Sequence, residues 1–106
     1  MQLLLSHAGI AVNTVNIDGH SALLMAALHN NHACVTALLC CPDIDANLAE
    51  RDGVTPLMAS AFKLHEECVA ALLECPTIDV NKATRDGVTP LLAAAQNGDG
   101  VCASLL

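Results

Sequence analysis

Residues 52–61 read Asp-Gly-Val-Thr-Pro-Leu-Met-Ala-Ser-Ala, and residues 86–95 read Asp-Gly-Val-Thr-Pro-Leu-Leu-Ala-Ala-Ala. Each stretch predicts the start of a helix, because threonine can cap the first turn and proline fits the first helical position, where no N–H donor is needed. The preceding Asp-Gly predicts a tight turn. The two stretches lie 34 residues apart, which indicates a repeat array.

The repeat extends over most of the chain. Residues 18–51 and 52–85 align without a gap and are identical at 16 of 34 positions. Residues 1–17 match the end of such a unit, and residues 86–106 match the beginning of one. We therefore predict a single array over residues 1–106, in which two repeats are flanked by two partial repeats.

The second half of each unit predicts a second helix, around residues 32–41 and 66–75. Apolar residues recur there at i, i+1, i+4 and i+5, which places them in one stripe along a helix. Pro42 and Pro76 end these helices, because proline cannot continue a helix. The following Ile-Asp-x-Asn stretch predicts an extended loop with a turn. The expected fold is all-α, a helix-loop-helix repeat solenoid with hairpin-like loops.

In this order and at these separations the motifs closely resemble the ankyrin repeat. The resemblance is carried by Thr-Pro-Leu, the paired alanines, the Leu-Leu helix and the Ile-Asp-Val-Asn tail, and it covers nearly all of the chain. It implies an ankyrin-type array that binds protein partners on one concave side.

The chain departs from the family pattern at two places. The residue after Thr-Pro-Leu, usually histidine in the family, is Met58 or Leu92. The glycine that many members place between the two helices is present as Gly98, but Asn30 and Leu64 stand at that place in the other units. Because leucine disfavours the left-handed backbone conformation, we expect the loop at Leu64 to be reshaped.

Composition restricts the partners and the compartment. Eleven acidic residues against four basic ones give a net charge of −7, which disfavours nucleic acid and anionic membranes as partners. The longest apolar run, Ala22 to Leu28, is far shorter than the ~18 to 20 residues of a membrane span. The N-terminus lacks the basic region of a signal peptide. We expect a soluble protein of the cytoplasm or nucleus.

Six cysteines in a short chain could form a disulfide framework. Cys34 and Cys68 lie 34 residues apart, as do Cys41 and Cys75, so each pair occupies equivalent positions of neighbouring units. Helices of neighbouring units pack ~8 to 10 Å apart, whereas a disulfide needs Cα atoms within ~7 Å. We therefore predict small buried thiols in a reducing compartment.

Two chemical hypotheses have less support. A metal site could use His29, His32 and Cys34, but no Cys-x-x-Cys pair accompanies them and the spacing is not repeated in the next unit. A cysteine nucleophile could use Cys68 with His65, yet no nucleophile elbow, phosphate loop or paired carboxylates accompany them. We predict no enzymatic activity, no catalytic residue, no metal ligand and no cofactor.

Other polar residues fit local structural roles. Asn13, Asn47 and Asn81 recur at one loop position, where we expect their side chains to satisfy local backbone groups. Glu66 and Glu67 fall in the first turn of a predicted helix, where acidic residues interact favourably with the helix dipole. We favour this explanation over an acidic binding patch.

Loop tips and first-helix ends line one side of such an array, and the resemblance implies that this side binds protein. Leu28 and Phe62 are unusual on a solvated surface, and Phe62 is the best candidate for a hot spot, although it could instead pack on the neighbouring helix. The predicted partner-binding residues are Asn16, Ile17, His20, Leu28, His29, Glu50, Arg51, Asp52, Val54, Phe62, Lys63, Thr84, Arg85, Asp86, Val88, Gln96 and Asn97.

The predicted function is a non-enzymatic protein-protein interaction module whose partner is a protein of unknown identity. The alternative is a structural spacer, part of a longer ankyrin-repeat protein and without a binding role of its own. Apolar stripes at residues 3–5 and 105–106 favour this alternative, because an end unit normally turns a polar face to water. The same stripes predict self-association through uncapped terminal repeats.

Overall fold

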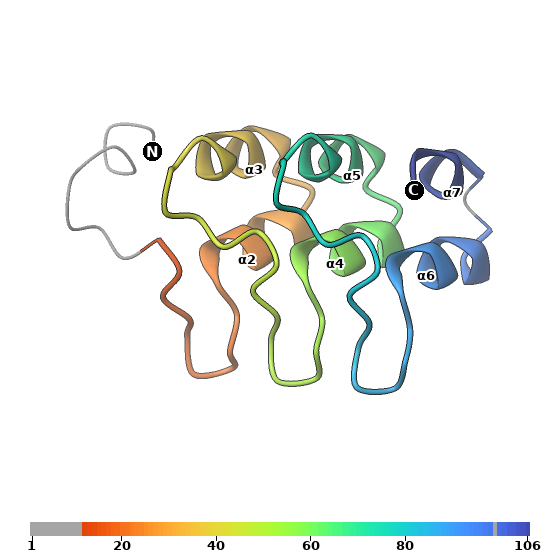
Figure 1. Ribbon diagram of the computed structural model, residues 1–106, viewed down its shortest axis with the longest axis horizontal. Coiled ribbons are helices and arrows are strands. Elements are labelled where there is room, and N and C mark those ends of the chain that lie inside the picture. The colour runs from red at the N-terminus through yellow and green to blue at the C-terminus, as the bar shows by residue number, and fades with distance from the viewer. Residues whose placement is uncertain (1–11, 99) are drawn as a thin grey trace.

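The computed structural model describes residues 12–98 and 100–106, which form a stack of helix pairs joined by long loops (Figure 1). Helices α2, α4 and α6 form one layer, α3, α5 and α7 form the other, and the loops project away below the first layer. These residues contain no strand, and one isolated antiparallel bridge joins Val15 and Ser21. In chain order the helices are α2 (Ala22–Leu28), α3 (His32–Leu39), α4 (Pro56–Phe62), α5 (Glu66–Leu73), α6 (Pro90–Gln96) and α7 (Gly100–Leu105).

This architecture confirms the predicted all-α helix-loop-helix solenoid. The first-layer helices begin at the predicted caps. The Thr55 hydroxyl accepts a hydrogen bond from the Met58 N–H at 3.2 Å, and the Thr89 hydroxyl accepts one from the Leu92 N–H at 3.3 Å. Ser21 caps α2 in the same way without a following proline.

The second-layer helices end two residues earlier than predicted. Cys40 and Glu74 are the C-caps of α3 and α5, so the turn begins ahead of Pro42 and Pro76. The core lies between the layers and is made of small and aliphatic side chains, each large one contributing ~1.5 to 3 kcal/mol when buried. Its fully buried members include Leu23, Ala27, Val35, Leu57, Ala61, Cys68, Val69, Leu72, Ala94 and Cys102.

The turn between the two helices of each unit is left-handed in all three units, with φ of 54° at Asn30, 62° at Leu64 and 73° at Gly98. The expected reshaping of the loop at Leu64 is therefore wrong. Neighbouring bonds hold the turn in place, because the His65 N–H donates to the Ser60 carbonyl at 2.8 Å and the His65 ring contacts the previous unit.

Asparagine side chains join consecutive loops. Asn13 donates to the Asp43 carbonyl at 2.8 Å and accepts from the Asp45 N–H at 2.8 Å. Asn47 makes the same two bonds with the unit that follows it, at 2.8 and 2.7 Å. The expectation of purely local bonds is wrong for these two residues, since their partners lie 30 and 32 residues further along the chain.

All six cysteines lie in the described residues, and none of them belongs to a disulfide. Cys41, Cys68 and Cys102 are buried as predicted, and two others are half-buried. Cys40 is exposed, because it caps the end of α3 and so leaves the apolar stripe of that helix. None of the helices in the described part of the chain has the length and apolar character needed to cross a membrane.

Candidate functional site

A groove of about 430 Å³ lies where the loop tips meet the first-layer helices. Met58 and Ala59 of α4 belong to its lining and are almost fully buried, so they form its floor. The other nine lining residues all belong to the set predicted from the sequence, namely Leu28, Asp52, Val54, Phe62, Lys63, Thr84, Asp86, Val88 and Gln96.

Apolar side chains form a large part of the groove lining. Phe62 is the last residue of α4, and 52% of its surface is exposed, so it does not pack away against a neighbouring helix. Its carbonyl accepts a hydrogen bond from the Asn97 side chain at 2.6 Å, which fixes the backbone at this point. Leu28 is half-buried and not exposed as the sequence suggested, while Val54 and Val88 add apolar surface from two loop tips.

Charges of opposite sign line the two sides of the groove. Asp52 and Asp86 are exposed carboxylates at successive loop tips, and Lys63 is the C-cap of α4 on the helix side. Among the described residues the one ion pair, at 3.9 Å, joins His32 and Glu67 on another face. The two groove carboxylates therefore have no cationic side chain bound to them.

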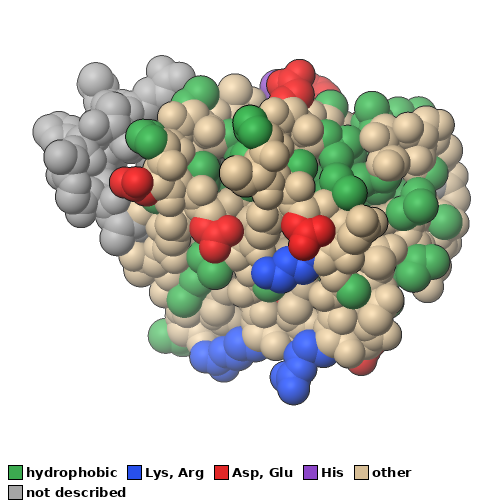
Figure 2. All heavy atoms as spheres, viewed as in Figure 1, with side chains coloured by type: hydrophobic (Ala, Val, Ile, Leu, Met, Phe, Trp, Pro, Cys, Tyr) green, Lys and Arg blue, Asp and Glu red, His purple; other side chains and the backbone are tan. Residues whose placement is uncertain are grey.

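Hydrogen bonds within and between the loops hold the tips in shape. The Glu50 carboxylate accepts from the N–H groups of Asp52 at 2.6 Å and Val54 at 3.1 Å, which closes the turn. The Arg51 side chain donates to the Ile17 carbonyl at 2.5 Å and so ties one tip to the preceding one. Figure 2 shows basic side chains along the lower edge of the viewed face, over the loop tips.

Eight of the predicted partner-binding residues do not line the groove. The Asn16 side chain closes its own turn, accepting from the N–H groups of Asp18 at 2.9 Å and His20 at 3.0 Å. Ile17 is 86% exposed at the tip of that turn. The eight residues outside the groove are Asn16, Ile17, His20, His29, Glu50, Arg51, Arg85 and Asn97.

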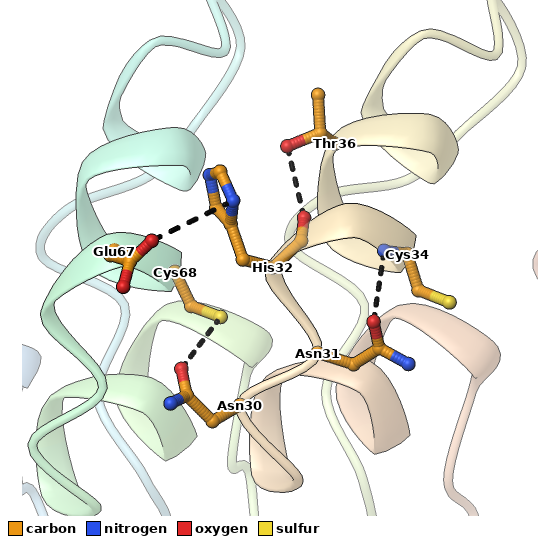
Figure 3. Close-up of polar contacts among 7 residues, drawn as sticks. All are labelled: Asn30, Asn31, His32, Cys34, Thr36, Glu67 and Cys68. Carbon is orange, nitrogen blue, oxygen red and sulfur yellow. Dashed lines mark hydrogen bonds and ion pairs between the residues drawn. The ribbon is translucent and has the colours of Figure 1, made fainter.

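A second groove, which the sequence did not predict, lies between α3 and α5 on the outer layer. It measures about 510 Å³. Figure 3 shows His32 and Glu67 facing each other across the two helices. The lining contains no lysine or arginine and consists of His32, Thr36, Leu39, Cys40, Glu67, Ala70, Ala71, Glu74, Cys75 and Pro76.

The geometry at Cys68 gives no support to a cysteine nucleophile. His65, the histidine nearest to Cys68 in the sequence, has its Nδ1 atom 2.8 Å from the Ala27 carbonyl. The Cys68 thiol contacts the Asn30 side chain at 3.6 Å (Figure 3). Burial raises the pKa of the Cys68 thiol, and the negative charge of Glu67 raises it further. Since the thiolate is the reactive form, these effects keep the thiol protonated and unreactive.

The described residues contain no cluster of side chains that could bind a metal ion. Across 12–98 and 100–106, no group of three or more His, Cys, Asp or Glu side chains is arranged to hold a metal ion. In particular, His32 faces Glu67, whereas the backbone N–H of Cys34 donates to the Asn31 side chain at 3.2 Å (Figure 3).

The stacked helix pairs, the left-handed turns and the projecting loops agree with a comparison of the sequence with known families. A family model described as ankyrin repeats in three copies matches residues 29–106, so the chain belongs to the ankyrin-repeat family. Ankyrin repeats are generally non-enzymatic modules of protein-protein interaction. A search of curated proteins gives no match.

Proposed function

We propose that the chain is a non-enzymatic interaction module that holds a segment of a partner protein in the groove between the loop tips and α4. The observation that carries this proposal is the position of Phe62, which is half-exposed over a floor of buried side chains. Aromatic residues near the centre of a well-packed patch dominate the binding energy of many protein interfaces.

The dimensions of the groove favour a weak or transient complex. Its volume of about 430 Å³ accommodates a short segment of a partner and not a whole domain face. We expect the interface to stay below the ~1,200 Å² of stable complexes. We further propose that residues 1–106 act as one array with repeats at 18–51 and 52–85, and that it works as a cytoplasmic scaffold, where the exposed Cys40 stays reduced.

The test compares immobilised wild-type protein with two variants that change opposite faces. Phe62→Ala removes the proposed hot spot, and Thr36→Arg changes the outer groove instead. Proteins captured from cell extract are quantified by mass spectrometry, and each candidate is then titrated as a purified protein. Partners that are lost with Phe62→Ala and kept with Thr36→Arg support the proposal. Partners that depend on Thr36 alone contradict it.

The spacer remains the second candidate function, and one observation favours it. Leu91 and Leu92 of α6 are each 49% exposed, whereas the equivalent Leu57 and Met58 of α4 are 0% and 5% exposed because α6 packs against α4. The outer face of α6 is therefore built like an internal face of the stack, and a further unit would fit it. A spacer predicts that substitutions in the groove leave every association of the protein unchanged.

A further inference from the structure

We propose, building on the function assigned to the groove, that its partner is an extended polyproline-II-type segment that carries basic side chains three residues apart with an apolar side chain between them. The chemistry of the two loop tips sets the charge of the partner, the distance between units sets the spacing, and the floor of the groove sets the apolar anchor.

The charge follows from Asp52 and Asp86. Both carboxylates line the groove, both are exposed, and neither takes part in an ion pair within the described part of the chain. The arginines of the same turns, Arg51 and Arg85, do not line the groove, and the Arg51 side chain is bonded to the preceding tip. A partner that places basic side chains against this wall gains two ion pairs.

The spacing follows from the repeat. Asp52 and Asp86 are equivalent residues of successive units, whose first-layer helices pack side by side, so they are separated by about one interhelix distance, ~8 to 10 Å. A polyproline II segment has three residues per turn and rises ~3.1 Å per residue, which brings side chains at i and i+3 to the same face ~9 Å apart. A β-strand returns to the same face every two residues, after only ~7 Å.

The rise of a helix argues against a helical partner. Helical side chains three residues apart are separated by a rise of only ~4.5 Å along the axis, about half of the ~8 to 10 Å between neighbouring units. A helix is also ~10 to 12 Å across. A polyproline II segment is slimmer, and its solvated backbone loses little conformational freedom on binding.

The apolar anchor and the orientation follow from the other groove residues. With the basic side chains against the loop tips, the intervening residue of the segment faces Phe62, Met58 and Val88. Lys63, on the opposite wall, repels basic side chains and can donate to backbone carbonyls of the segment. The segment therefore has one favourable rotation about its own axis.

Two peptides of identical composition test the spacing. The first is Ac-Pro-Lys-Leu-Pro-Lys-Leu-Pro-NH2, with lysines at i and i+3, and the second is Ac-Pro-Lys-Leu-Lys-Pro-Leu-Pro-NH2, with lysines at i and i+2. Each is titrated into the 15N-labelled full chain and followed by 1H–15N correlation spectra. We expect the first peptide to bind about 2- to 5-fold more tightly, with shifts around Phe62 and the two loop tips, because the second peptide can pair with only one of the two carboxylates and each exposed ion pair contributes about 2- to 5-fold in affinity.

Matched variants test the charge. We expect Asp52→Asn and Asp86→Asn each to weaken binding of the first peptide about 2- to 5-fold, and the double variant to abolish its advantage over the second peptide. Glu74→Gln removes the same charge from the outer groove and should leave the affinity unchanged. A third peptide with glutamates in place of the lysines should not bind.

Three outcomes overturn the inference, and they are separable from a failure of the proposed function. Equal binding of both lysine peptides with shifts at Phe62 leaves the groove as the binding surface but removes the stated partner chemistry. Shifts on α3 and α5 that disappear with Glu74→Gln place the basic segment in the outer groove. A peptide concentration of about 2 mM detects binding as weak as ~4 kcal/mol, so absence of shifts at this concentration rejects this class of partner. The proposed function is then tested only by the capture experiment with Phe62→Ala.

Discussion

Leu64 shows how a single residue can be held in a conformation that its side chain disfavours. Its φ of 62° costs a non-glycine residue ~1 to 2 kcal/mol. The turn keeps this conformation because the next residue, His65, is bonded to the Ser60 carbonyl through its N–H and contacts the Ala27 carbonyl through its ring. Leu64→Gly removes this strain but gives the unfolded chain more conformational freedom, worth ~0.5 to 1 kcal/mol. We expect a net gain of about 0.5 kcal/mol in the free energy of unfolding, measured by urea denaturation.

Asn30 provides the control for this prediction. It adopts the same left-handed conformation, which asparagine tolerates better than leucine, and its side chain also contacts the Cys68 thiol. Asn30→Gly should therefore bring no gain in stability. If Leu64→Gly lowers the free energy of unfolding as much as a glycine placed inside a helix does, the turn is not strained at Leu64.

The Cys68 thiol makes stability depend on alkaline pH. Burial and the charge of Glu67 raise the pKa of the Cys68 thiol in the folded state, so the unfolded chain loses this proton first. The contribution of the protonated thiol is therefore complete at neutral pH and declines as the pH rises above about 8.5, the pKa of an unperturbed thiol. We expect the free energy of unfolding to fall less between pH 7 and pH 10 in Cys68→Ala than in the wild type.

The exposed Cys40 separates this effect from general alkaline destabilisation. Cys40→Ala should keep the pH dependence of the wild type, because it removes an exposed thiol and leaves the buried Cys68 thiol in place. If the free energy of unfolding falls equally with pH in the wild type, Cys68→Ala and Cys40→Ala, burial of the Cys68 thiol does not contribute to the pH dependence of stability.

At the scale of elements, the side chain of Asn47 links consecutive loops through two hydrogen bonds of 2.8 and 2.7 Å. Each such bond contributes ~0.5 to 1.5 kcal/mol, and the backbone groups of Thr77 and Asp79 lose their partner when it is removed. We therefore expect Asn47→Ala to lower the free energy of unfolding by about 1 to 3 kcal/mol, measured by urea denaturation.

Asn81 is the matched control for Asn47, because it stands at the same position one unit later. Its side chain makes no such bonds with the described residues, and its own N–H donates to Asp79 at 3.0 Å. Asn81→Ala should cost less than about 0.5 kcal/mol, as surface substitutions usually do. Equal losses at both positions would mean that the asparagine acts within its own loop.

The elements themselves were largely predictable from local chemistry. Thr55 and Thr89 cap helices where the Thr-Pro motif predicts them, because capping depends on residues only three positions apart. The ends of α3 and α5 were predicted too late, because Pro42 sets only the latest end of a helix, and the C-cap at Cys40 has no sequence signal of its own. The bonds of Asn47 were missed because their partners lie in another unit.

At the scale of the whole molecule, the repeat made most residues of the groove predictable, but it did not show which residues form the floor of the groove. Equivalent residues such as Asp52 and Asp86 line one surface because the units stack in register. Met58 and Ala59 were missed because a floor residue looks like any core residue in the sequence. The outer groove depends on the small side chains of two neighbouring helices, including Ala70 and Ala71, and no local motif marks it.

The stack also predicts how the cost of one substitution changes along the array. Leu57 and Leu91 follow the proline of the Thr-Pro motif in α4 and α6, but Leu57 is fully buried beneath the next unit and Leu91 is 49% exposed. Leu57→Ala removes buried methyl groups and leaves a cavity, so we expect the free energy of unfolding to fall by about 2 to 5 kcal/mol. Leu91→Ala should cost less than about 1 kcal/mol, because about half of that side chain contacts water already.

Urea denaturation of the two variants, with the same chain in the same buffer, measures this difference. Because the stability of a repeat array is approximately the sum of unit stabilities and nearest-neighbour interfaces, the two costs differ by what the α4–α6 interface contributes at this position. A loss at Leu91 that equals the loss at Leu57 would mean that the exposed face of α6 is covered in solution, by self-association of the chain. Light scattering then measures the mass of the wild type and of Leu91→Ala. A mass that falls in Leu91→Ala shows self-association through α6, whereas equal monomer masses would mean that the assumed stacking of α6 on α4 is wrong.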